Sequence, residues 1–119
     1  MDLMKEEHKS PEYLKLNPNG LIPTMVEGDF ILYESHAILR YLADSWKVED
    51  HWYPKDLWKW ALVNRYLDWH HSNLWQGLTF WIHWKMDEIK GGAKVEDIEV
   101  THFKQILKWS LKIMDQWLG

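Results

Sequence analysis

Two short apolar runs near the start of the chain are rich in β-branched and aromatic residues. They cover residues 21–26 and 30–33, and the turn signals Asn19-Gly20 and Glu27-Gly28-Asp29 precede and separate them. Strand-forming runs joined by a tight turn predict a β-hairpin.

Two helices are predicted on either side of this hairpin. Ser10-Pro11-Glu12 combines a capping serine, a proline at the first helical position and an acidic first turn, and Asn17-Pro18 ends that helix. After the hairpin, apolar residues recur at helical spacing from Ala37 to Trp46, and Ser35 occupies the predicted N-cap position. The second helix is therefore expected to start at Ser35.

The rest of the chain carries two long helical patterns. Pro54 opens the first, whose apolar stripe includes Leu57, Trp58, Ala61, Leu62, Tyr66 and Trp69 and whose pattern continues to Glu88. Gly91-Gly92 interrupts it, and a second stripe runs from Val95 to Trp117. Two antiparallel helices joined at the glycine pair are expected. The polar segment 44–50 marks a predicted boundary between residues 1–46 and residues 47–119.

Composition excludes several classes of function. Fourteen basic residues against 18 acidic ones give a net charge of −4, which argues against nucleic acid or an anionic membrane as the main partner. The absence of cysteine excludes disulfides, thiolate zinc sites and a cysteine nucleophile. No signal peptide or bilayer-spanning apolar stretch is found in the sequence, so a cytoplasmic location is expected.

The junction between the second strand and its helix offers a specific chemistry. Free backbone N–H groups, the positive end of the helix dipole and the Ser35 hydroxyl converge at one point, which suits a carboxylate or phosphate. The neighbouring Glu34 carboxylate could hold an ammonium group, so the pair could bind an α-amino acid head group. The alternative is a plain capped helix.

These residues carry a family resemblance. The segment NPNGLIPTMVEGDFILYESHAILRYLADSW resembles the second half of the thioredoxin-like domain of glutathione S-transferases, and its flanks resemble the theta class and its insect and plant relatives. The resemblance covers Leu3 to about Leu74. It implies an α+β fold, in which a partial thioredoxin-like segment (helix, β-hairpin, helix) precedes two long antiparallel helices of the all-α C-terminal domain.

The resemblance also implies a set of glutathione contacts. Pro23 would be cis, so that the Ile22 backbone binds the cysteine of glutathione, while Glu34 and Ser35 bind the γ-glutamyl end. His8 and Lys9 would contact the glycine carboxylate, although a solvated polar loop explains them equally well. Met1 to Met4 would be the tail of the family's second strand.

Asp68, His71 and Ser72 form a second polar cluster, because helical spacing places Asp68 on one face with His71 or Ser72. Adjacent histidines point in different directions and no third ligand follows at suitable spacing, so no metal is expected. By resemblance, this stretch lines the cleft between the two domains and approaches the glutathione of the neighbouring subunit in a homodimer.

Ten tryptophans raise the possibility of sugar or base stacking, but packing in the core or between helices is the simpler expectation. Trp60 and Trp75 do not lie well on the apolar stripe, and they are expected to add exposed apolar surface. Such surface indicates a partner interface or a tendency to aggregate.

The catalytic serine, tyrosine or cysteine of the family lies upstream of anything in this sequence, so no catalytic residue is assigned. The first strand and helix and the last helices of the family also have no counterpart. Three readings follow. The chain is a glutathione S-transferase-like protein that conjugates glutathione to small electrophilic molecules, a non-catalytic glutathione-binding or protein-interaction module, or a truncated product without independent function.

Overall fold

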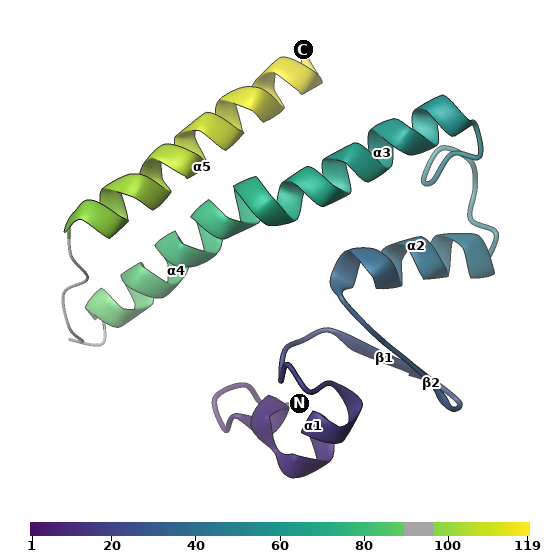
Figure 1. The fold of residues 1–119 in the computed structure, drawn as a ribbon, viewed down its shortest axis with the longest axis horizontal. Helices are drawn as coiled ribbons and strands as arrows, with labels where there is room; N and C mark the ends of the chain where they lie inside the picture. The colour runs from purple at the N-terminus through teal and green to yellow at the C-terminus, as the bar shows by residue number, and fades with distance from the viewer. Residues whose placement is uncertain (90–96) are drawn as a thin grey trace. The chain divides into compact units, whose positions relative to one another are not determined.

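A computed structural model describes residues 1–89 and 97–119 (Figure 1). Its elements are η1 (Glu7–Lys9), α1 (Pro11–Leu16), β1 (Thr24–Glu27), β2 (Phe30–Tyr33), α2 (Ser35–Ser45), α3 (Leu57–Trp69), η2 (His70–Trp75), α4 (Gln76–Ile89) and α5 (Asp97–Leu118). The predicted turn at Gly91-Gly92 lies outside the described residues. Contacts divide the chain into unit 1, Met1–Trp60, and unit 2, Ala61–Gly119. The predicted domain boundary after Trp46 remains a proposal.

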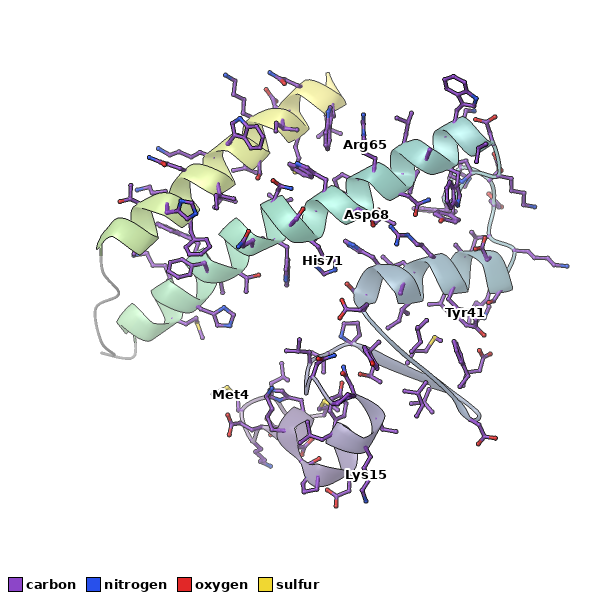
Figure 2. All side chains as sticks on the ribbon, in the orientation of Figure 1. Met4, Lys15, Tyr41, Arg65, Asp68 and His71 are labelled. Atoms are coloured by element: carbon purple, nitrogen blue, oxygen red, sulfur yellow. The ribbon has the colours of Figure 1, made fainter. Side chains whose placement is uncertain are left out.

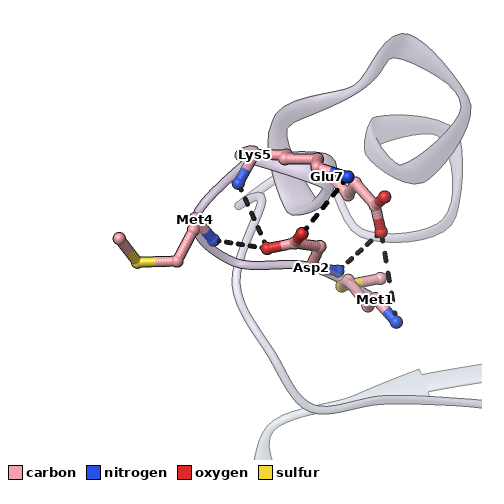
Figure 3. Close-up of polar contacts among 5 residues, drawn as sticks. All are labelled: Met1, Asp2, Met4, Lys5 and Glu7. Carbon is pink, nitrogen blue, oxygen red and sulfur yellow. Dashed lines mark hydrogen bonds and ion pairs between the residues drawn. The ribbon is translucent and has the colours of Figure 1, made fainter.

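The first residues form a turn, so the expectation that Met1 to Met4 end a strand is wrong. The Asp2 carboxylate accepts hydrogen bonds from the backbone N–H groups of Met4 at 2.9 Å and Lys5 at 3.3 Å (Figure 3). The Glu7 carboxylate accepts a further bond from the Asp2 N–H at 2.6 Å. These side chains bind backbone donors that a strand would offer to a neighbouring strand.

Helix α1 begins and ends as the sequence predicted. The Ser10 hydroxyl accepts a bond from the Tyr13 N–H at 3.2 Å, and Pro11 occupies the first helical position. The helix ends at Leu16, and Asn17 follows it in an extended conformation.

The hairpin pairs β1 with β2 antiparallel, with Thr24 opposite Tyr33 and Glu27 opposite Phe30. Gly28 has a φ of +59° in the turn, a conformation that glycine adopts without steric cost. The first strand begins at Thr24, three residues later than predicted. The reason is that side chains of α1 and its C-terminal end bind the Leu21 carbonyl, and Pro23 has no N–H to donate.

Helix α2 starts at Ser35 as predicted, but the prediction that Ser35 is the N-cap is wrong. Glu34 is the N-cap, because its carbonyl accepts the first helical hydrogen bond from the Ile38 N–H at 3.0 Å. Ser35 is therefore the first residue inside the helix.

Helix α3 starts at Leu57, so the prediction that Pro54 opens it is wrong. Asp56 caps this helix, since its carboxylate accepts from the Lys59 N–H at 3.0 Å and its carbonyl accepts from the Trp60 N–H at 2.8 Å. No residue of α3 is buried, and Trp58 is 83% exposed. The apolar stripe predicted for this helix is thus largely uncovered.

Unit 2 is built on one long helix and its antiparallel neighbour. Segment η2 is a π-helix, and the chain passes through it from α3 into α4 without leaving helical conformation. Helix α5 packs along this helix (Figure 1). Phe80 stacks on Phe103 with ring centroids 4.0 Å apart, and Trp69 meets Trp117 edge to face at 4.9 Å. The order of these contacts confirms the predicted antiparallel pairing.

Most tryptophans are not core residues, contrary to the packing expectation. Seven of the nine whose side chains are described are exposed: Trp46, Trp52, Trp58, Trp60, Trp75, Trp109 and Trp117. Trp60 and Trp75 are exposed as predicted. Within the described residues, no helix has the length and apolar character needed to cross a bilayer.

Candidate functional site

Four of the predicted site residues lie at one end of the hairpin in unit 1. Because Thr24 pairs with Tyr33, the residues that precede β1 and those that follow β2 leave the hairpin at the same end. Ile22 and Pro23 precede β1, and Glu34 and Ser35 follow β2. The hairpin register thereby brings together two dipeptides that are eleven positions apart in the sequence.

Glu34 and Ser35 present unsatisfied polar groups at the N-terminus of α2. In the described part of the chain, no group binds the Ser35 hydroxyl, the Ser35 N–H or the Glu34 carboxylate. Glu34 has a φ of +75°, which is uncommon for a residue with a side chain and is typical of positions that serve function. The first N–H groups of a helix and its dipole favour an anion, and the carboxylate favours a cation. The pair suits a zwitterionic group.

A hydrogen-bond network holds the loop that carries Ile22 and Pro23. The Tyr13 hydroxyl donates to the Leu21 carbonyl at 2.6 Å and lies 2.8 Å from the Thr24 hydroxyl. The amide of Asn17, which is only 2% exposed, donates to the same carbonyl at 2.9 Å and to Thr24 at 3.1 Å. These buried bonds fix the loop on both sides of the dipeptide.

The Ile22-Pro23 peptide bond is cis, as the resemblance implied. No residue described by the structure binds the N–H or the carbonyl of Ile22, and Ile22 is half exposed. The sequence analysis missed the supporting residues Tyr13, Asn17 and Thr24. Asn17 was interpreted only as a helix end, and nothing in the spacing showed that its amide reaches back over the loop.

His8 and Lys9 lie in η1, and Lys9 contacts the segment that precedes Ile22. Lys9 Nζ donates to the Asn19 carbonyl at 3.5 Å. The same Nζ lies close to Gly20, since a Cβ added to this glycine would be 2.9 Å from it. His8 is partly buried, and its Nδ1 has no hydrogen-bond partner among the described residues. Lys9 therefore places a cation beside the segment that leads to Ile22.

The second predicted cluster lies where α3 passes into η2. Asp68 and His71 lie along the edge of the long helix away from α5 (Figure 2). The Ser72 hydroxyl lies 3.4 Å from the Asp68 carbonyl and 3.3 Å from the Trp69 carbonyl, and it accepts from the Asn73 amide at 2.8 Å. Ser72 thus bonds to the backbone of its own helix. Burial lowers the pKa of the neighbouring His70, with a further contribution from His71, so His70 is neutral at pH 7.

An open groove of about 730 Å³ extends along unit 2 from this cluster to α5. Its lining is mostly aromatic and imidazole side chains: His71, Ser72, Trp75, Gln76, Thr79, Phe80, His83 and Phe103. His83 Nδ1 lies 2.8 Å from the Thr79 carbonyl, and since a carbonyl only accepts, Nδ1 carries the proton.

Sequence reasoning missed most of this groove. His71, Trp75, Thr79 and His83 recur at intervals of four, which is a helical-face signal, but Phe103 comes from another helix. Within residues 1–89 and 97–119, no group of three metal-ligating side chains is arranged to hold an ion.

Comparisons with known proteins show which family this chain is similar to. Residues 1–44 match the family model "Glutathione S-transferase, N-terminal domain". Human glutathione S-transferase theta-2B is 40% identical over all of this chain, which covers 49% of that protein. The solved human glutathione transferase theta-2, in complex with glutathione and an unknown ligand, is 38% identical with a TM-score of 0.78, over 99% of this chain and 47% of that one.

A second human theta-class structure, in complex with the glutathione conjugate of 1-menaphthyl sulfate, is also 38% identical, with a TM-score of 0.78, over 94% of this chain and 46% of that one. The chain spans about half the length of the curated relatives it matches. The chain is therefore similar in sequence and fold to theta-class glutathione S-transferases over about half of their length.

Proposed function

We propose that this chain binds glutathione through unit 1. The observation that carries the proposal is the unsatisfied group of donors and acceptors at Glu34 and Ser35. The γ-glutamyl end of glutathione has an α-carboxylate and an α-ammonium group. The carboxylate would bind the Ser35 hydroxyl and the N-terminal N–H groups of α2, and the ammonium group would bind the Glu34 carboxylate.

The remaining parts of glutathione would lie along the loop before β1. The Ile22 N–H and carbonyl, unbound by any described residue, match the backbone groups of the cysteine. His8 and Lys9 would supply cationic or hydrogen-bonding contacts to the glycine carboxylate. The binding of glutathione by a solved homologue supports this assignment.

We further propose that the electrophilic partner is a small, largely apolar molecule and that the aromatic groove of unit 2 binds it. The lining of Trp75, Phe80 and Phe103 suits a flat ring system. A homologue solved with a glutathione conjugate supports the transferase reading. A non-catalytic glutathione-binding module is the second candidate, because the Ser72 hydroxyl bonds to the carbonyls of its own helix.

We also propose a homodimer in the cytoplasm. The many exposed large apolar side chains of α3, including Leu57, Trp58 and Leu62, support association with a second copy. The absence of cysteine suits a reducing compartment. This proposal includes an approach to the glutathione of the neighbouring subunit by Asp68, His71 and Ser72.

Calorimetric titration with glutathione tests the proposed site. Loss of a hydrogen bond to a charged group costs about 1.5–3 kcal/mol, so Ser35→Ala is expected to weaken binding at least tenfold. Ser45→Ala, at the other end of α2, is the matched control and is expected to bind like the unmodified chain. Equal affinity for the unmodified chain and the Ser35→Ala variant would remove Ser35 from the site.

A further inference from the structure

The side of α5 that faces away from α4 carries a row of lysines. Helix α5 packs on α4 and η2 by one side, where Ser110 is completely buried, and no described element of unit 2 covers the opposite side (Figure 1). Lys104, Lys108 and Lys112 follow one another at intervals of four on that side, and all three are exposed. None of them forms an ion pair with a residue that the structure describes. We call these three residues the lysine face.

A fourth lysine, from α4, extends the positive surface. Lys104 Nζ lies 5.7 Å from the centre of the Trp81 ring, and Lys85 Nζ lies 5.9 Å from the centre of the same ring. The indole of Trp81 thus has one ammonium group from each helix at cation–π distance. The positive charge therefore spans the pair of helices and is not confined to α5.

No acidic residue occurs in the stretches that carry these lysines. Residues 69–86 contain one lysine and residues 100–114 contain three, and neither stretch contains Asp or Glu. Asp115 ends the lysine face at its C-terminal side. Salt screens exposed charges beyond about 8 Å at physiological ionic strength, so the field at this face depends on the charges close to it. The net charge of −4, which comes from residues 1–60, therefore does not decide what the lysine face attracts.

Large apolar side chains border the lysine face. Trp109 is 59% exposed and Leu111 is 52% exposed. At about 3.6 residues per turn, these two side chains fall on opposite flanks of the row of lysines. Indole rings are favoured at the boundary between lipid headgroups and hydrocarbon, and a leucine gains free energy when it leaves water.

We propose that the lysine face of α5, together with Lys85, binds the surface of an anionic lipid membrane. Clustered lysines attract anionic headgroups, and exposed tryptophan and leucine side chains enter the interface beside them. Nucleic acid is the other common polyanion, but residues 100–114 contain no arginine, the side chain whose planar fork suits phosphates and base edges. This surface goes beyond the proposed glutathione function and does not depend on it.

Sedimentation with sucrose-loaded vesicles tests the proposal on the full 119-residue chain. Phosphatidylcholine vesicles that contain one quarter phosphatidylserine are expected to bind the chain at least tenfold more tightly than pure phosphatidylcholine vesicles. Each lysine near an anionic surface contributes about a fivefold factor in affinity, so Lys104→Gln combined with Lys108→Gln is expected to weaken binding at least tenfold. Lys15→Gln combined with Lys55→Gln changes the net charge equally in unit 1, and it is expected to leave the affinity nearly unchanged.

A measurement on the unmodified chain guards against loss of fold in the variants. Its binding to the phosphatidylserine vesicles is expected to fall at least tenfold when the salt concentration rises from about 0.05 M to about 0.5 M, because salt screens the lysines. Binding that does not depend on salt, equal binding to both kinds of vesicle, or equal effects of the two double substitutions would overturn the proposal. A duplex oligonucleotide that binds the chain more tightly than these vesicles would also overturn it, since the partner would then be a nucleic acid.

Discussion

At the scale of single residues, two side chains hold the loop before β1: Tyr13 and Asn17. Both are buried, and both donate to the Leu21 carbonyl. Strand pairing does not satisfy this carbonyl, so the two side chains take the place of a donor from a neighbouring strand. These two side chains therefore determine where β1 begins and how Ile22 is presented.

Replacement of Tyr13 by phenylalanine tests the role of this hydroxyl. It removes the bond to Leu21 and the contact with Thr24 but leaves the Asn17 amide on the same carbonyl. The free energy of unfolding is expected to fall by about 1–2 kcal/mol, as measured by urea denaturation. Tyr33→Phe is the control, because the Tyr33 hydroxyl binds no residue that the structure describes. Equal losses in the two variants would show that the network adds no stability.

A second feature at the scale of single residues is the backbone conformation of Glu34. Its φ of +75° costs conformational energy that a glycine would avoid. In this conformation the Glu34 carbonyl accepts the first helical hydrogen bond of α2, and the Glu34 carboxylate stays exposed. Strain of this kind persists where the surrounding structure and the function both require it.

The pairing of α4 with α5 shows what a single small residue does at the scale of elements. Gly77 lies against the backbone of α5, and a Cβ at this position would be 2.9 Å from the Leu107 backbone nitrogen. Glycine weakens an isolated helix by about 1 kcal/mol relative to alanine, so its place here follows from the close approach of the two helices. The same approach brings Phe80 onto Phe103.

Gly77→Ala is therefore expected to destabilise unit 2, although alanine favours helix. The overpacking cost of about 1–3 kcal/mol exceeds the gain in helix propensity, so the midpoint of thermal unfolding should fall. Gln76→Ala, at the exposed neighbouring position, provides the comparison and should leave the midpoint nearly unchanged. A higher midpoint for Gly77→Ala would mean that α5 does not approach α4 this closely in solution.

The distribution of charge matters at the scale of the whole molecule. Residues 1–60 hold 7 basic and 11 acidic residues, and residues 61–119 hold 7 of each, so the net charge of −4 comes from unit 1. Glutathione is itself an anion at neutral pH. In the proposed complex, its binding to an acidic unit would depend on local groups such as the α2 N–H groups and Lys9, since the overall field does not favour it.

The whole chain is expected to conjugate glutathione to an electrophile little faster than buffer does. A free thiol with a pKa of about 8.5 is only a few per cent thiolate at neutral pH, and the Ser72 hydroxyl already bonds to the carbonyls of its own helix. The rate of conjugation of a chromogenic aryl halide by the purified chain measures this. Tyr33→Phe and Ser72→Ala are the control variants. Robust turnover that either variant abolishes would contradict the prediction and identify a donor at a new position.

Local patterns in the sequence determined the existence and type of most elements. The Ser10-Pro11 start, the hairpin turn at Gly28 and the start of α2 were all predicted, because each depends on a preference of the residues at that position. The Glu34-Ser35 pair was identified from the sequence for the same reason. The resemblance then implied the cis peptide at Ile22-Pro23, which the structure confirms.

Contacts between residues far apart in the sequence decided the features that local patterns did not predict. The late start of β1 depends on side chains of Tyr13 and Asn17, and the start of α3 at Leu57 depends on a cap that competes with Pro54. The aromatic groove of unit 2 combines side chains of more than one helix, and a helical pattern shows one helix face at a time. The sequence by itself therefore determined which elements form and which chemistry the α2 N-terminus offers. Only the tertiary structure decided which apolar side chains remain exposed, because burial depends on what packs against a face and not on the periodicity that produces it.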